Sequence, residues 1–117
     1  MGQANYAVRG RTAVITLDHP PVNALSHDVR RGIVDGLDVA QGDPRVTAIV
    51  LIGNGKGFSA GADVNEIGRD AGRREPMLTN VIRTLETCEK PVVGAIHGIT
   101  SGGGLELALA CHYRVAA

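Results

Sequence analysis

The segment PVVGAIHGITSGGGLELALA, residues 91–110, contains the features that decide the fold. It begins with PVVGAIH, a short apolar run that is typical of a strand buried on both faces, as in a parallel sheet. It ends with LELALA, a run of strong helix formers, and three consecutive glycines at 102–104 separate the two. A glycine inside a helix costs about 1 kcal/mol relative to alanine, so the triplet must meet another requirement.

The same alternation of strand and helix occurs upstream. TAVITL at 12–17 predicts one strand, and VTAIVLI at 46–52 predicts a second strand that is buried on both faces. Between them, Ser26 can cap a helix from His27 to Ala40. Four apolar residues at helical spacing line one face of this helix: Val29, Ile33, Leu37 and Ala40.

Downstream, ADVNEI at 62–67 predicts one or two helical turns, and GRDAGRREP at 68–76 predicts a polar loop. Pro76 fits the first turn of a further helix. That helix carries apolar residues at spacings of three, four and seven: Leu78, Val81, Ile82 and Leu85. HYRVAA at 112–117 predicts the start of another strand. Strands that alternate with helices predict an α/β domain with right-handed parallel crossovers.

The composition narrows the function classes. The chain has 117 residues, enough for one domain, and its 12 basic and 12 acidic residues balance. A net charge of zero argues against nucleic acid or an anionic membrane as the main partner. No apolar run has membrane-spanning length, and the first ten residues lack the apolar core of a signal peptide. Cys88 and Cys111 lie in apolar contexts, which favours buried free thiols and a cytoplasmic protein.

Glycine is the anomalous residue, with 16 copies that concentrate at Gly53–Gly61 and Gly94–Gly104. Both windows follow a predicted strand, and α/β folds place their sites at the carboxyl ends of strands. One hypothesis is that each glycine turn aims a backbone N–H at a single developing negative oxygen, which would form an oxyanion hole. The alternative is that the glycines only permit close packing of helix and strand.

Two side-chain motifs also fit the first window. GKGFSA at 55–60 matches the loose dinucleotide pattern GxGxxA, although Gly61 interrupts the helix that should follow. GFSAG at 57–61 matches a nucleophile elbow with Ser59, but five residues separate Ser59 from the end of the strand. The nominal catalytic partners of Ser59 would be acidic residues and histidines elsewhere in the chain: Asp63, Asp70, His97 and His112.

Glu106 is the single carboxylate in the apolar run after the triplet. Its neighbours predict a helix that is buried nearly all round, where loss of solvation would raise the pKa of the carboxyl group. Such a group suits a general acid or base. Alternatively, the side chain could turn to solvent or pair with Arg114.

Three motifs together resemble one family. HPPVNALS at 19–26, GNGKGFSAGADVNEI at 53–67 and PVVGAIHGITSGGGLELALACHYRVAA at 91–117 resemble, in order and spacing, the signatures of the crotonase (enoyl-CoA hydratase/isomerase) superfamily. The resemblance covers essentially the whole chain and implies a ClpP/crotonase-like spiral of ββα units. The last motif looks most like the amino-terminal hydratase/isomerase half of bifunctional enzymes fused to 3-hydroxyacyl-CoA dehydrogenase.

The resemblance implies a role for particular residues. The backbone N–H groups of Ala62 and Gly103 would form the oxyanion hole for a thioester carbonyl. Glu106 would activate water for addition to a 2-enoyl-CoA in fatty-acid β-oxidation, or would shuttle a proton in a Δ3,Δ2-enoyl-CoA isomerase. Coenzyme A, as part of the substrate, would contact a wider set: Pro21, Val22, Ala24, Lys56, Ala60, Asp63, Val64 and Gly102. Asp63 would also brace its turn, and Ser59 would be a loop residue.

The sequence departs from the family in two ways. Ser101 stands where an apolar residue is more usual before the glycines, and the second glutamate of hydratases falls after Ala117. We therefore expect residues 1–117 to be the amino-terminal, incomplete part of one crotonase-fold domain, weakly active or inactive alone. The resemblance implies no separate cofactor and no metal, and a full-length protein that is a homo-oligomer or is fused to a dehydrogenase. A serine hydrolase using Ser59 and a non-catalytic binding module remain the alternatives.

Overall fold

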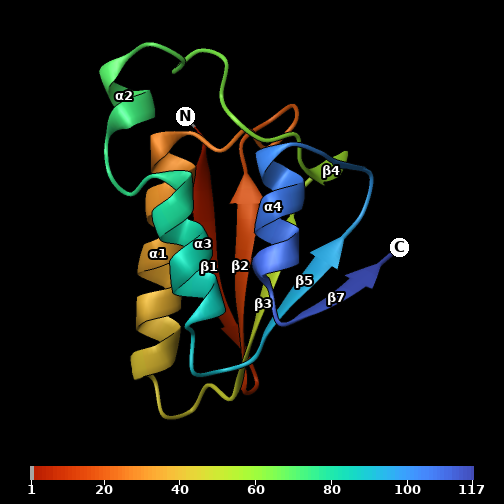
Figure 1. The fold of residues 1–117 in the computed structure, drawn as a ribbon. Helices are drawn as coiled ribbons and strands as arrows, with labels where there is room; N and C mark the ends of the chain where they lie inside the picture. Colours follow the sequence, from red (N-terminus) through yellow and green to blue (C-terminus); the bar gives the residue numbers. More distant parts are fainter. Residues whose placement is uncertain (1) are drawn as a thin grey trace.

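A computed structural model describes residues 2–117. Its main sheet has five strands in the order β1-β2-β3-β5-β7 (Figure 1). These strands are β1 (Gln3–Arg9), β2 (Thr12–Asp18), β3 (Ala48–Gly53), β5 (Val92–Ile96) and β7 (Tyr113–Ala116). β1 pairs antiparallel with β2, whereas every later pairing in this sheet is parallel. The buried β-branched runs predicted as strands therefore form the centre of the sheet.

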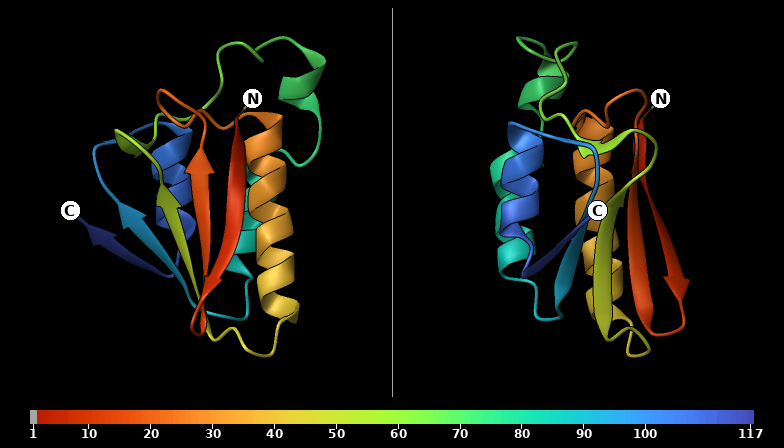
Figure 2. Two further views of the ribbon diagram at one scale, coloured as in Figure 1. Left: turned by 180° about the vertical axis from the view of Figure 1, so that it is seen from behind. Right: turned by 90° about the vertical axis from the view of Figure 1, so that its right-hand side faces the viewer.

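The helices cover one face of this sheet, and the view from behind shows the opposite face (Figures 1 and 2). They are α1 (His27–Gly42), α2 (Asp70–Arg73), α3 (Leu78–Glu86) and α4 (Gly103–Ala110). The Ser26 side chain caps α1 as predicted, because its Oγ accepts the N–H of Val29 at 3.2 Å. The apolar face of α1 packs on the sheet, with Ile33 and Leu37 fully buried.

Two short strands, β4 (Gly57–Ser59) and β6 (Ile99–Thr100), form a separate parallel pair beyond the carboxyl ends of β3 and β5. Each successive unit of the chain thus consists of two strands followed by a helical segment, as expected for a spiral of ββα units. The pairing also joins the two glycine windows, since the Ser101 N–H donates to the Ser59 carbonyl at 3.1 Å.

The structure differs from the sequence-based expectations in five places. The chain has a first strand, β1, that was not predicted, and ADVNEI at 62–67 forms turns instead of helix. The helical turn lies instead at Asp70–Arg73, inside the segment expected to be a loop. Pro76 precedes α3 and is not in its first turn, because that helix begins at Leu78. α4 is only half buried, since it is covered on one side by the sheet and α3, and Leu109 on its outer side is 60% exposed.

Gly104 is the point at which α4 packs against β4. A Cβ atom at this position would collide with the carbonyl group of Ser59, which is backbone and cannot turn away. Overpacking a core costs about 1–3 kcal/mol when side chains can adjust, so Gly104→Ala should lower the free energy of unfolding by about 3 kcal/mol. Urea unfolding monitored by circular dichroism measures this change.

Gly42→Ala is the matched control, because no atom lies within 4 Å of a Cβ at that position of α1. This variant should be as stable as the unaltered chain or slightly more stable. Equal unfolding midpoints for Gly104→Ala and Gly42→Ala would contradict the packing role of Gly104.

Candidate active site

Three loops meet at the carboxyl ends of β2, β3 and β5. The loop after β2 is tied to the first glycine window by two backbone hydrogen bonds: Ala60 N–H to Val22 at 2.9 Å and Leu25 N–H to Gly61 at 2.7 Å. The β4–β6 pair then brings the glycine triplet alongside. The site that the sequence predicted from separate motifs is therefore one continuous region.

Gly61 and Gly103 are in direct contact across this junction. A Cβ atom at Gly61 would lie 2.9 Å from the backbone nitrogen of Gly103, and Gly61 has a φ of +102° that disfavours other residues. Within residues 2–117, the N–H groups of Ala62 and Gly103 find no acceptor. Two unpaired backbone donors thus flank one glycine contact, as the oxyanion-hole hypothesis requires.

The three glycines of the triplet meet different requirements. Gly102 has a φ of +53° and turns the chain into α4, whose first residue is Gly103. Gly103 faces apolar side chains, since a Cβ there would approach Leu78 and Leu25 at 2.9 and 3.5 Å. Of the three glycines, only Gly104 packs directly against the backbone of a strand, as the close-packing alternative requires. The structure therefore shows the packing role for Gly104, and the oxyanion role of Gly103 stays a prediction.

Two cavities adjoin this junction. The first has a volume of about 190 Å³ and is bounded by Leu25, Arg30, Met77, Leu78 and several residues between Ala62 and Arg73. The second has a volume of about 390 Å³ and lies between the loop at 19–24 and the turn at 60–65. Ala62 and Asp63 line both cavities, so the unpaired Ala62 N–H lies where the two meet.

Most residues expected to contact coenzyme A line the second cavity. They are Pro21, Val22, Ala24, Ala60, Asp63 and Val64. Lys56 and Gly102 lie outside it: Lys56 is exposed in the turn between β3 and β4, and Gly102 is exposed before α4. Asp63 braces its turn as expected, because its Oδ1 accepts the Asn65 N–H at 2.9 Å.

Ser59 is structural. It is fully buried in β4, where its Oγ donates to the Asn23 carbonyl at 2.7 Å and accepts the Gly61 N–H at 3.1 Å. The histidines named as its partners bond elsewhere: His97 to the Gly55 carbonyl and His112 to the Val92 N–H. The nucleophile-elbow hypothesis is therefore wrong. The dinucleotide hypothesis fails as well, because GKGFSA forms a turn and a strand with no helix after it.

Glu106 lies one turn after Gly103 on α4, so both residues face the same side of the helix. The expectation of a buried carboxylate was wrong, since Glu106 is exposed together with Leu105. Its apolar neighbours predicted burial, but α4 is packed on only one side. Arg114 does not pair with it; the guanidinium donates instead to carbonyls at the end of α4, including that of Cys111 at 2.9 Å.

Asn23 is a positioning residue that the sequence did not reveal. It is buried with a φ of +53°, and its Nδ2 donates to the carbonyls of Asn54 and Gly57 at 2.9 and 3.0 Å. Its Oδ1 accepts the His19 N–H at 2.9 Å. Asn23 therefore fixes the loop after β2 to the first glycine window. The tolerance of asparagine for this backbone conformation was the available signal.

The two cysteines, Cys88 and Cys111, are free and buried as predicted. Burial raises the pKa of the Cys111 thiol to about 11, which leaves it protonated and unreactive at neutral pH. Among residues 2–117 there is no group of three His, Cys, Asp or Glu side chains placed to hold a metal ion. The helices of this described part are each too short or too polar to cross a membrane.

Comparisons with known proteins agree with this geometry. The family model described as enoyl-CoA hydratase/isomerase matches residues 8–117. A peroxisomal bifunctional enzyme of Danio rerio is 48% identical over 109 residues, which are 93% of this chain and 15% of that protein. A probable enoyl-CoA hydratase of Bacillus subtilis is 39% identical over 122 residues, which are 100% of this chain and 47% of that protein.

Solved structures share the fold. An enoyl-CoA hydratase from Polaromonas sp. JS666 superposes with a TM-score of 0.87 at 32% identity, covering 99% of this chain and 48% of that chain. A putative enoyl-CoA hydratase/isomerase (crotonase) from Legionella pneumophila also gives a TM-score of 0.87. The chain thus spans about half the length of these hydratases. It has the crotonase fold and belongs to the enoyl-CoA hydratase/isomerase family.

Proposed function

We propose that this chain supplies the oxyanion hole and the acyl-CoA-binding loops of an enoyl-CoA hydratase of fatty-acid β-oxidation. One observation carries the proposal: the unpaired N–H groups of Ala62 and Gly103 flank one glycine contact, and Ala62 lines both adjoining cavities. The family model and the relatives named as hydratases support the same chemistry.

In this proposal the thioester carbonyl of a 2-enoyl-CoA accepts hydrogen bonds from both N–H groups. The acyl chain occupies the first cavity, beside Leu25 and Leu78, and coenzyme A lies along the second. When water adds at C3, negative charge develops on the carbonyl oxygen. Each well-placed donor stabilises such an oxygen by about 3–4 kcal/mol in the transition state.

Two features of α4 support this chemistry. Gly103 is the first residue of the helix, so its N–H lies at the positive end of the helix dipole. Glu106 lies one turn further on. We assign its carboxylate as the base that takes a proton from the water molecule while that water attacks C3. The proton for C2 comes from a second acid that we do not assign to residues 2–117.

Three assignments accompany this proposal. Coenzyme A enters as part of the substrate, so we propose no separate cofactor. The cytoplasmic location stays a prediction, because the relative from Danio rerio is named as peroxisomal. Assembly into a homo-oligomer, or fusion to a dehydrogenase, also stays a prediction.

Binding by the chain tests the proposal. Butyryl-CoA should bind more tightly than free coenzyme A, because the carbonyl and the acyl chain add contacts, and isothermal titration calorimetry measures both affinities. Gly61→Ala should abolish that difference, since its Cβ would lie 2.9 Å from the Gly103 nitrogen and obstruct the donor.

Gly10→Ala is the control for backbone strain. Gly10 has a φ of +62°, but no atom lies within 4 Å of a Cβ there. This variant should keep the preference for butyryl-CoA. Equal affinities of the unaltered chain for butyryl-CoA and free coenzyme A would contradict the proposed function.

A further inference from the structure

Arg30 is a buried cation in α1 that the proposed chemistry does not use, and it is only 6% exposed. Its guanidinium makes five hydrogen bonds. The acceptors are four backbone carbonyls, of Leu25 at 2.8 Å, Ala71 at 2.9 Å, Arg74 at 3.2 Å and Pro76 at 2.7 Å, and Glu66 Oε1 at 3.2 Å. One side chain therefore joins α1 to the segment 66–76, which is distant in sequence.

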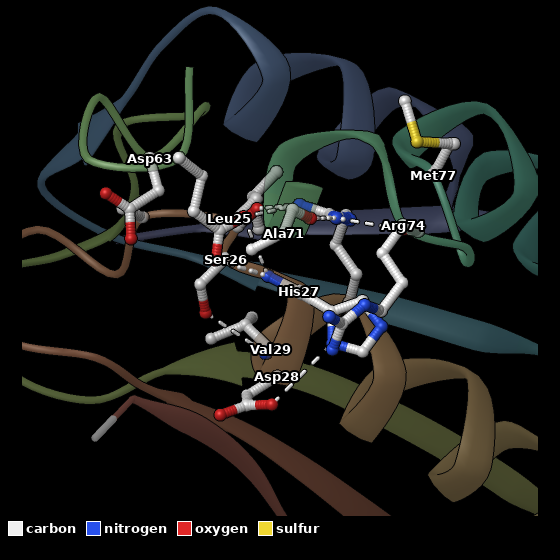
Figure 3. Close-up of polar contacts among 12 residues, drawn as sticks. Leu25, Ser26, His27, Asp28, Val29, Asp63, Ala71, Arg74 and Met77 are labelled. Atoms are coloured by element: carbon white, nitrogen blue, oxygen red, sulfur yellow. Dashed lines mark hydrogen bonds and ion pairs between the residues drawn. The ribbon is translucent and has the colours of Figure 1, made fainter. Parts of the chain in front are cut away.

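The start of α1 reinforces this connection (Figure 3). The His27 N–H donates to both carboxylate oxygens of Glu66 at 3.1 and 3.0 Å. The His27 ring bonds the Glu75 carbonyl at 2.9 Å. The segment 66–76 thus has few apolar contacts with the core and is held mainly by polar contacts to α1.

The same segment forms a wall of the first cavity, through Ile67, Gly68, Gly72 and Arg73. With this wall in place the cavity has a volume of about 190 Å³. Pockets for drug-sized ligands are larger, about 300–1,000 Å³. The space beside the oxyanion donors therefore suits a short acyl group, and a long chain requires the wall to move.

We propose that Arg30 is a specificity-determining positioning residue, which restricts the site to short acyl chains by holding segment 66–76 against the cavity. The inference rests on the proposed function, since it takes the ligand to be an acyl-CoA. Arginine is required because its planar fork can reach several carbonyls at once, whereas lysine offers a single ammonium group.

The test compares Arg30→Lys and Arg30→Met with Arg31→Lys. Arg31 is the matched control because it is exposed on the same helix and pairs only with exposed Asp35, at 3.4 Å. Calorimetry gives the affinities for free coenzyme A, butyryl-CoA and decanoyl-CoA. Hydrogen exchange reports separately on the amides of 66–76.

In the unaltered chain and in Arg31→Lys, butyryl-CoA should bind more tightly than decanoyl-CoA. Both Arg30 variants should shift that ratio toward decanoyl-CoA by about tenfold or more, the scale on which apolar pockets discriminate chain length. The affinity for free coenzyme A should not change, because Arg30 does not line the second cavity. Exchange should accelerate in segment 66–76 and stay unchanged in the sheet.

The outcomes separate the two proposals. An unaltered chain that binds butyryl-CoA no better than free coenzyme A overturns the proposed function and this inference with it. Arg30 itself also lines the first cavity, so hydrogen exchange must show that the wall has been released. A chain that prefers butyryl-CoA overturns the inference alone in either of two cases: the length preference is the same in Arg30→Lys, or it changes without faster exchange in segment 66–76. If Arg30→Met does not fold, Arg30→Lys decides the question, since it keeps the charge and the length of the side chain.

Discussion

Replacing Glu106 with glutamine, in a protein that carries the complete crotonase-fold domain, is expected to slow hydration of crotonyl-CoA by about 10²–10⁴-fold, the usual contribution of a general acid or base. Glutamine keeps the size of the side chain but cannot take a proton from water. Glu106 is exposed and one helical turn from the Gly103 donor, so the substitution removes no packing. Loss of the enoyl-thioester absorbance measures the rate.

Glu86→Gln is the control for this prediction. Glu86 is an exposed glutamate at the end of α3, on a different helix from the Gly103 donor. Both variants should unfold within about 0.5 kcal/mol of the unaltered chain, as surface substitutions generally do. A Glu106→Gln chain that hydrates crotonyl-CoA at the rate of Glu86→Gln would remove Glu106 from the mechanism.

In the same complete domain, Gly103→Pro is expected to lower kcat by about 10²–10³-fold, the effect of deleting one oxyanion donor. Proline has no N–H and is well tolerated at the first position of a helix, which is where Gly103 lies in α4. The Gly103 N–H has no acceptor within residues 2–117, so its removal breaks no hydrogen bond of that part of the chain.

Gly103→Ala distinguishes loss of the N–H from added bulk. Its Cβ would lie 2.9 Å from Leu78 Cδ2, which is the end of a flexible side chain and can move. Alanine keeps the donor, so this variant should retain most of the activity that proline removes. Equal loss in both variants would show that space at Gly103 matters and that its N–H does not.

The sequence predicted the parts of the fold that depend on local patterns. Buried β-branched runs identified β2, β3 and β5, and Ser26 identified the start of α1 to the residue. β1 was missed because its alternation is weak: Ala4 and Tyr6 are half-buried and Val8 is exposed. Its pairing with β2 supplies the stability that its own residues do not.

The site was predictable where backbone chemistry determines it and unpredictable where tertiary packing does. Glycines beside strand ends indicated which backbone N–H groups are left unpaired at one junction, whereas the exposure of Glu106 depends on which side of α4 other elements cover. In sequence, Arg30 and Arg31 are equivalent members of one helix. Only the folding of segment 66–76 over α1 buries the first and leaves the second in solvent.

Polarisation of a bound thioester carbonyl tests the central claim most directly. Crotonyl-CoA carrying ¹³C at the thioester carbonyl would be bound to the unaltered chain, and its stretching frequency measured by infrared difference spectroscopy. Two N–H donors, from Ala62 and Gly103, should weaken the carbonyl bond and lower this frequency below that of the free thioester. Gly103→Pro should lose part of the shift and Gly103→Ala should keep it. A saturated complex whose carbonyl frequency equals that of free crotonyl-CoA would contradict the account.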